Sequence, residues 1–170
     1  MPGSHERSLR ALDKRGRLRA LSQRAGIDFS SNDYLGLAAS AELQAAAEAA
    51  LQRGVPLGAG GSRLLRGNDP EHEALEAEAA AMFSAQSALF FGGGFVANFA
   101  LFSTLPQRED LVVHDALIHA SVHDGLRAAR AVALSAPHND AQAFDDTIRS
   151  WRNEGGTGRP WIAVESLYSM

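Results

Sequence analysis

Hydrophobic and polar positions follow two different periods along the second half of the chain. Short apolar runs predict strands, at 88–91, 111–114, 131–134 and 161–164. Apolar residues at helical spacing predict the helices between them, at 95–105, 118–129 and 141–152. Because strands alternate with helices, we expect an α/β fold with a mainly parallel sheet that is covered on both faces.

The first half of the chain reads as helices joined by polar and glycine-rich segments. A helix is expected over 8–24 and a short extended piece over 27–32. Ser40 is placed to cap a second helix that ends near Arg53. A glycine-rich loop follows at 58–62, too short to link two domains.

A third helix should begin at Asp69-Pro70-Glu71. The aspartate can accept bonds from free N–H groups, proline fits the first helical position, and the glutamate suits the helix dipole. One face of this helix is apolar and is expected to be buried, and it consists of Leu75, Ala79, Met82 and Phe83.

Composition narrows the class of protein. The 170 residues are 45% hydrophobic and 21% charged, as in an ordinary globular protein, and no apolar run is long enough to span a membrane. The absence of cysteine excludes disulfides and thiolate metal sites and agrees with a cytoplasmic protein. The net charge of −4 argues against a dedicated nucleic-acid binder. Basic residues near the N-terminus are expected to form a solvated helix face rather than a nucleic-acid or membrane surface, and they are Arg7, Arg10, Lys14, Arg15, Arg17, Arg19 and Arg24.

The junction at Gly92-Gly93-Gly94 is the clearest candidate site. A strand should end there and a helix begin, and free N–H groups at a helix N-terminus attract a phosphate. The pattern is neither a P-loop nor a dinucleotide fingerprint. A tight turn without a ligand is the alternative interpretation.

Histidines and carboxylates cluster after the strand at 111–114, and they are His114, Asp115, His119, His123 and Asp124. His119 and His123 lie one helical turn apart, which suits zinc, but the glutamate of a zincin motif is missing, so a structural or surface role is favoured over a metal. His119 differs because it follows the carboxyl end of a strand, where an imidazole can stack on a planar cofactor.

Two further stretches carry polar groups near strand ends. Glu165 follows the strand at 161–164, where a carboxylate can orient a substrate or tune a proton transfer, or else pair with an arginine. His138-Asn139-Asp140 is most simply a turn and a helix cap.

Taken together, these motifs resemble the α-oxoamine synthase family of pyridoxal-phosphate enzymes. The matching stretches occur in order along nearly the whole chain, at 29–37 (FSSNDYLGL), 58–63 (GAGGSR), 67–76 (GNDPEHEALE), 91–98 (FGGGFVAN), 114–121 (HDALIHAS), 138–140 (HND) and 165–170 (ESLYSM). The version at 67–76 favours the branch that joins a pimeloyl thioester to L-alanine in biotin synthesis over the aminolevulinate, aminoketobutyrate and sphingoid-base branches.

The resemblance implies fold type I and a cytoplasmic homodimer with active sites at the subunit interface. It divides the chain into an N-terminal helix and extended segment, 1–39, and an incomplete cofactor-binding large domain, 40–170. The implied reaction condenses the acyl thioester with the amino acid and releases carbon dioxide and coenzyme A.

Site residues carried over from the resemblance fall into three groups. The backbones of Gly94 and Phe95, with Ser169, are implied to contact pyridoxal 5′-phosphate. His119 is implied to stack on its ring, and Glu165 to lie in the active site, both as catalytic residues. The implied substrate-binding residues, by a looser match, are Arg19 and Asn32.

The chain departs from the family because the lysine that bonds to the cofactor aldehyde is missing. That lysine, and the aspartate and histidine that contact the cofactor ring, follow the 165–170 motif in the family. The one lysine here, Lys14, lies in the predicted first helix. We therefore expect an N-terminal portion of a synthase that binds the cofactor weakly at best, exposes apolar surface and does not turn over alone. The alternatives are another α-oxoamine synthase and a non-catalytic α/β module that binds a phosphorylated ligand at 92–95.

Overall fold

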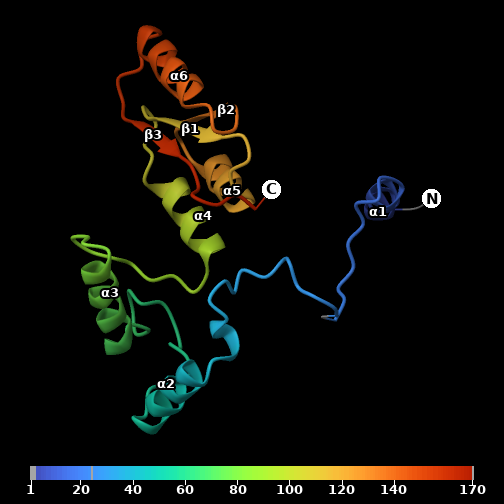
Figure 1. The fold of residues 1–170 in the computed structure, drawn as a ribbon. Coiled ribbons are helices and arrows are strands. Elements are labelled where there is room, and N and C mark those ends of the chain that lie inside the picture. Colours follow the sequence, from blue (N-terminus) through green and yellow to red (C-terminus); the bar gives the residue numbers. More distant parts are fainter. Residues whose placement is uncertain (1–2, 24, 170) are drawn as a thin grey trace. The chain divides into compact units, whose positions relative to one another are not determined.

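The chain separates into two units, Met1–Gly60 and Gly61–Met170, of which the computed structural model describes residues 3–23 and 25–169 (Figure 1). The first unit contains α1 (Ser4–Lys14), the 3-10 turn η1 (Leu37–Ala39) and α2 (Ala41–Gln52). The second contains α3 (Pro70–Met82), α4 (Gly94–Thr104), β1 (Leu111–Asp115), α5 (Ala120–Ala128), β2 (Val132–Ala136), α6 (Ala141–Asn153) and β3 (Pro160–Ala163).

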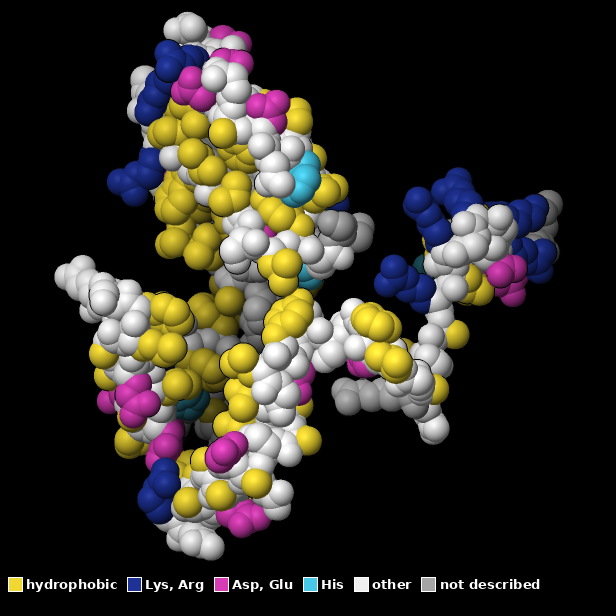
Figure 2. Space-filling model, in the orientation of Figure 1, with side chains coloured by type: hydrophobic (Ala, Val, Ile, Leu, Met, Phe, Trp, Pro, Cys, Tyr) yellow, Lys and Arg dark blue, Asp and Glu magenta, His cyan; other side chains and the backbone are white. Residues whose placement is uncertain are grey.

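The first helix is shorter than predicted. α1 ends at Lys14 rather than continuing through 24, which itself lies outside the described residues. Gly16 has φ +62°, and the N–H of Arg17 donates to the Leu12 carbonyl at 2.9 Å, which is the glycine-ended hydrogen-bond pattern that closes a helix. Figure 2 shows Lys and Arg side chains around α1, none of whose residues is buried.

The extended piece predicted over 27–32 is a bend. Asp28 Oδ1 accepts bonds from the Ser30 N–H at 2.8 Å and the Ser30 hydroxyl at 2.9 Å. The Asp33 N–H in turn donates to the Ser31 hydroxyl at 3.0 Å. Side-chain bonds of this kind turn the backbone locally and replace the pairing that a strand would need.

The caps of the next two helices are confirmed. Ser40 Oγ accepts from the Leu43 N–H at 3.1 Å at the start of α2. Asp69 Oδ1 accepts from the Glu71 N–H at 3.0 Å at the start of α3, and His72 Nδ1 accepts from the Asp69 N–H at 3.2 Å. The burial predicted for the apolar face of α3 is wrong, because Leu75, Met82 and Phe83 remain exposed and the unit provides no layer against that face.

The three strands form a parallel sheet in the order β2-β1-β3. β1 therefore lies in the middle, and β3 lies at an edge with Ile162 59% exposed. The predicted α/β class and parallel pairing are confirmed, and the boundaries of the elements in 95–164 shift by at most two residues.

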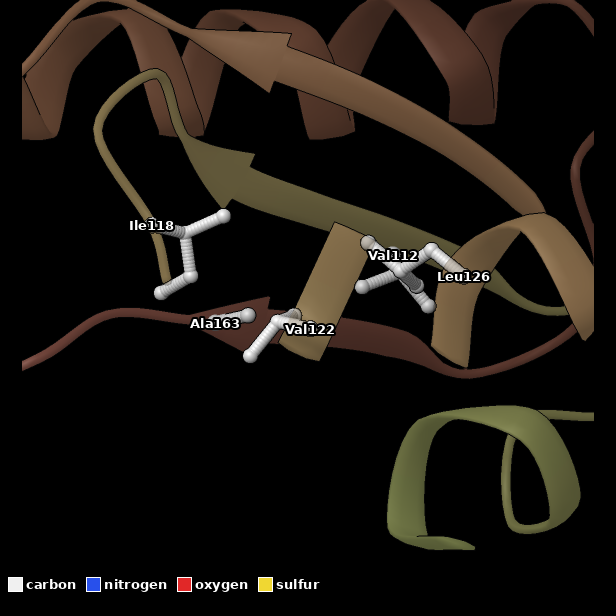
Figure 3. Close-up of a cluster of buried hydrophobic side chains, with 5 residues drawn as sticks. All are labelled: Val112, Ile118, Val122, Leu126 and Ala163. Carbon is white, nitrogen blue, oxygen red and sulfur yellow. The ribbon is translucent and has the colours of Figure 1, made fainter. Parts of the chain in front are cut away.

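Both faces of β1 are buried, as its unbroken apolar run predicts. Val112 packs with Ala163 of β3 and with Ile118, Val122 and Leu126, which belong to α5 and the turn before it (Figure 3). A second cluster on the opposite face joins Leu111, Val113 and Ala136 to Phe144 of α6. α5 and α6 thus cover opposite faces of the sheet (Figure 1).

The strand predicted at 88–91 is wrong. Residues 88–91 have no strand partner within the described residues and lead directly into the triple glycine. An apolar run becomes a strand only when a neighbour takes its backbone hydrogen bonds. None of the helices in the described part of the chain is both long enough and apolar enough to cross a bilayer.

Candidate functional site

The first turn of α4 follows the triple glycine directly. Gly93 is its N-cap in extended backbone, and among the described residues no side chain caps this end. Apart from neighbouring residues of the chain and the backbone of α4 itself, no described atom lies within 4 Å of the positions that Cβ atoms at 92–94 would occupy. The free N–H groups of an 11-residue helix therefore face open space, which is the arrangement that binds an anion.

His119 is the N-cap of α5, which explains why this helix starts at Ala120 rather than at Ile118 as predicted. Its Nδ1 accepts the Ser121 N–H at 3.1 Å and lies 2.7 Å from Ser121 Oγ. The ring is therefore held by its own helix while its other edge stays exposed.

The contact between His119 and Ser121 continues to Asn98 of the neighbouring helix α4. Ser121 is fully buried, and its Oγ accepts a hydrogen bond from Asn98 Nδ2 of α4 at 3.0 Å. Gly125, one turn further along α5, allows the two helices to approach closely. A Cβ there would meet Phe102 Cβ at 3.0 Å and the carbonyl oxygens of Phe99 and Asn98 at 3.1 and 3.2 Å.

Glu165 approaches His119 from the end of β3. Its Oε1 accepts the His119 backbone N–H at 2.8 Å, and its own N–H donates to the Tyr168 hydroxyl at 3.1 Å. The carboxylate is thus engaged with backbone rather than with the arginine considered from the sequence. Ser169 lies in the exposed segment that follows β3.

These groups meet at one open pocket of about 480 Å³, which is lined in part by Gly94, Phe95, Asn98, His119 and Glu165. Four of the residues predicted from the sequence are therefore brought together within the second unit. The lining also includes Ser166 and Leu167 but not Ser169. The roles of the predicted site residues of this unit toward a ligand stay predictions.

A buried carboxylate lies at the same carboxyl edge of the sheet. Asp115 accepts hydrogen bonds from the Leu117 N–H at 2.8 Å, the Asn139 N–H at 3.0 Å and His138 Nδ1 at 2.9 Å. Burial opposes its charged form, but these hydrogen bonds outweigh burial and lower the pKa of Asp115 to about 2. Asp140 caps α6 through the Ala143 N–H at 3.0 Å, so the predicted turn and cap also hold Asp115.

The histidines considered as a chelating pair are engaged separately. His123 packs edge-on against the His114 ring at 4.9 Å between centroids, whereas His119 contacts Ser121. Burial, and the nearby His114 and Arg127, lower the pKa of His123. Among the described residues, no three His, Asp or Glu side chains converge with the geometry of a metal site.

Arg19 and Asn32 belong to the first unit, and both side chains are exposed. Their predicted roles toward a substrate stay predictions.

Sequence reasoning missed Asn98 and Ser121 as parts of this region, and it considered Asp115 only as a member of a possible metal cluster. All three lie inside stretches that carried the family resemblance, 91–98 and 114–121. Their place in a motif was the available signal, but their partners are distant in sequence, 23 residues apart for Asn98 and Ser121.

The sequence profile described as aminotransferase class I and II matches residues 24–170. The chain belongs to this family. Within it, the resemblance to α-oxoamine synthases is confirmed by sequence and structural relatives alike.

Two sequence relatives have the same name. The chain is 41% identical over 155 residues to the 8-amino-7-oxononanoate synthase of Emericella nidulans, covering 86% of this chain and 38% of the relative. It is 40% identical over 178 residues to the enzyme of that name from Granulibacter bethesdensis, covering 96% and 46%. The chain thus spans less than half the length of these relatives, which is consistent with an N-terminal portion.

Solved structures confirm the fold. Serine palmitoyltransferase of Sphingomonas wittichii matches with a TM-score of 0.74 and 30% identity, over 81% of this chain and 34% of that one. The 8-amino-7-oxononanoate synthase of Francisella tularensis matches with a TM-score of 0.59 and 30% identity, over 71% and 33%. The expected pyridoxal-phosphate transferase fold is therefore shown.

Proposed function

We propose that the chain is the N-terminal portion of an 8-amino-7-oxononanoate synthase, which condenses a pimeloyl thioester with L-alanine in biotin synthesis. The observation that carries this proposal is the pocket that joins the uncapped α4 N-terminus to the exposed ring of His119. The roughly 40% identity to synthases of this name supports the choice of reaction.

Pyridoxal 5′-phosphate fits the residues that are present. The N–H groups of Gly94 and Phe95 offer donors for its phosphate, and the open space over the glycines leaves room for it. When bound, the cofactor supplies the electron sink for decarboxylation and carbon–carbon bond formation. Solved structures of serine palmitoyltransferase, a structural neighbour, contain this cofactor.

The side chains of this chain are proposed to bind and orient the cofactor and the substrates. His119 offers a flat imidazole held in place by Ser121, against which an aromatic ring can stack. Glu165 holds the His119 backbone through the N–H and keeps its second carboxylate oxygen for the site. Ser169, Arg19 and Asn32 are proposed to contact cofactor and substrates, in a cytoplasmic homodimer.

The activity is proposed to belong to a longer chain, which also supplies the cofactor-bonding lysine. The single lysine of this sequence, Lys14, lies on the exposed helix α1. A lysine amine is needed both to hold the aldehyde and to move the α-proton. The 170 residues alone are therefore expected to bind the cofactor without turnover.

A proline at Gly94 tests the phosphate site. Proline at the first helical position keeps the helix and removes one N–H donor. We expect Gly94→Pro to weaken binding of pyridoxal phosphate about tenfold or more, the factor for one hydrogen bond to a charged group, and to leave binding of unphosphorylated pyridoxal unchanged. Fluorescence titration of the chain measures both affinities.

The matched control is Ala41→Pro, which places proline at the first position of α2 behind its Ser40 cap. It should leave both affinities unchanged. Equal affinity of wild type for pyridoxal and pyridoxal phosphate, or a Gly94→Pro variant that binds as wild type does, would contradict the proposed site.

The choice of substrate is tested in a chain that carries the lysine. Coenzyme A release is measured with pimeloyl and longer acyl thioesters, each paired with alanine, glycine or serine. A preference for pimeloyl thioester and alanine supports the proposal. A preference for serine and a long acyl chain would favour the alternative function, that of another α-oxoamine synthase. The similarity to serine palmitoyltransferase supports this alternative.

A further inference from the structure

The hydrogen bonds behind His119 can have only one direction, because two of their donors are amides. The Ser121 backbone N–H points at His119 Nδ1 at 3.1 Å, and an amide N–H cannot accept. This bond needs a lone pair on Nδ1, so it favours the form of the neutral ring that carries its proton on Nε2.

The Ser121 hydroxyl also donates toward His119. Its Oγ receives a hydrogen bond from Asn98 Nδ2 at 3.0 Å, and a side-chain amide nitrogen only donates. The hydroxyl proton is then free for the nearest acceptor, His119 Nδ1 at 2.7 Å. Asn98, Ser121 and His119 form a polarised chain in which each group donates to the next.

This chain of hydrogen bonds is built into the packing of two helices. Ser121 is 0% exposed, so water does not compete for its hydroxyl. Gly125 permits the close approach of α4 and α5, and the Asn98 carbonyl lies 3.2 Å from where its Cβ would be. Asn98 also lines the pocket one turn after Gly94, on the helix whose N-terminus faces the proposed phosphate.

We propose that Asn98 and Ser121 are positioning residues that fix the orientation of the His119 ring and place its proton on Nε2. Their importance for catalysis rests on the proposed function, in which this ring stacks on the cofactor. A ring held by a buried donor presents one face and one N–H to the pocket in advance of binding.

The tautomer is measured directly on the chain without cofactor. Long-range proton–nitrogen correlation NMR at pH 8, where ordinary imidazoles are neutral, distinguishes the protonated ring nitrogen from the bare one. Comparison with His119→Gln assigns the resonances. We expect wild type to show a bare Nδ1 and a protonated Nε2.

Two variants test the positioning residues. Ser121→Ala removes the hydroxyl donor and keeps the backbone N–H at Nδ1, so the share of the ring protonated on Nε2 should fall and the two nitrogen shifts of His119 should move part of the way toward each other. Asn98→Asp keeps the shape but turns a donor into an acceptor, which draws the Ser121 proton away and shifts the ring toward protonated Nδ1. Asn153→Asp, exposed on α6, makes the same charge change elsewhere and should leave His119 unchanged.

A second readout links the ring to ligand binding. Ser121→Ala should raise the Kd for pyridoxal phosphate about fivefold, the factor for one net hydrogen bond. The inference is overturned if wild type carries its proton on Nδ1, or if both variants leave the tautomer unmoved. If the tautomer behaves as expected and wild type does not bind pyridoxal phosphate, the proposed function fails and the positioning chain stands.

Discussion

Single residues at the carboxyl edge of the sheet are fixed by bonds from several directions. Asp115 is the clearest case, since backbone N–H groups and one imidazole satisfy a carboxylate that is only 1% exposed. A buried charge is tolerated only when it is compensated in this way. Asp115 thereby ties the end of β1 to the turn at 138–140.

Asp115→Asn should lower the melting temperature, because one amide oxygen cannot replace two carboxylate oxygens and the new NH2 faces a donor. The pKa of Asp115 is lowered to about 2, so its contribution is present above the ordinary aspartate range, near 4, and is lost as pH falls toward 2. The difference between wild type and variant should therefore shrink below about pH 4.

Thermal unfolding between pH 2 and 7 measures this difference. The control is Asp146→Asn, an exposed position on α6. A difference that persists unchanged at pH 2 would show that the charge of Asp115 does not stabilise the fold.

Elements are joined through side chains that bond to residues 13 or 14 positions away in sequence. Arg63 and Glu76 pair at 2.5 and 3.0 Å, and Glu76 Oε1 also accepts the Phe90 N–H at 2.8 Å. The Arg63 and Phe90 bonds lower the pKa of Glu76 to about 2. α3 is thus bonded to the segment that leads into the glycines before α4.

Glu76→Ala should release the segment at 88–91 from α3. Because the hydrogen bond that holds the Phe90 N–H is removed, amide hydrogen exchange there should quicken about tenfold or more, as expected when local opening becomes easier by more than 1 kcal/mol. Mass spectrometry of the exchanged peptides gives the rates. Glu78→Ala, exposed on the same helix, provides the control, and equal rates in both variants would refute the anchoring role.

Helix starts were predictable at this scale, and helix ends and strands less so. Ser40, Asp69 and Asp140 cap helices within three residues of themselves, so local sequence specifies them. The helix expected over 8–24 ended early, because a single glycine in left-handed backbone outweighed a continuing apolar period. The strand expected at 88–91 lacked a pairing neighbour.

At the scale of the whole molecule, the described residues form one well-packed region and expose much apolar surface. The packed region is the sheet with its flanking α5 and α6, and Figure 2 shows hydrophobic side chains gathered on the face that carries β3. Exposed apolar surface of this extent marks surfaces that other chain segments or partners cover. This exposure agrees with the expectation from the sequence that the chain exposes apolar surface.

Leu111→Ala tests which region holds the second unit together. Leu111 is 0% exposed in the middle strand, so its truncation should reduce the free energy of unfolding by about 2–5 kcal/mol. Leu64, at 95% exposure, is the matched control. Leu64→Ala should change the free energy of unfolding by less than about 0.5 kcal/mol. Urea denaturation compares them, and equal losses would place the core elsewhere.

The sequence by itself determined the α/β class, the parallel strands and the caps of α2, α3 and α6. These features depend on periodicity and on bonds that span a few residues. Tertiary structure decided the rest: the strand order, the exposure of α3, and the partners of His119, Asn98 and Asp115. Glu165 reaches His119 across 46 residues of sequence, and only the packing of β3 beside β1 and α5 brings such groups to hydrogen-bonding distance. Close contacts of this kind are set by how layers pack, which no local pattern encodes.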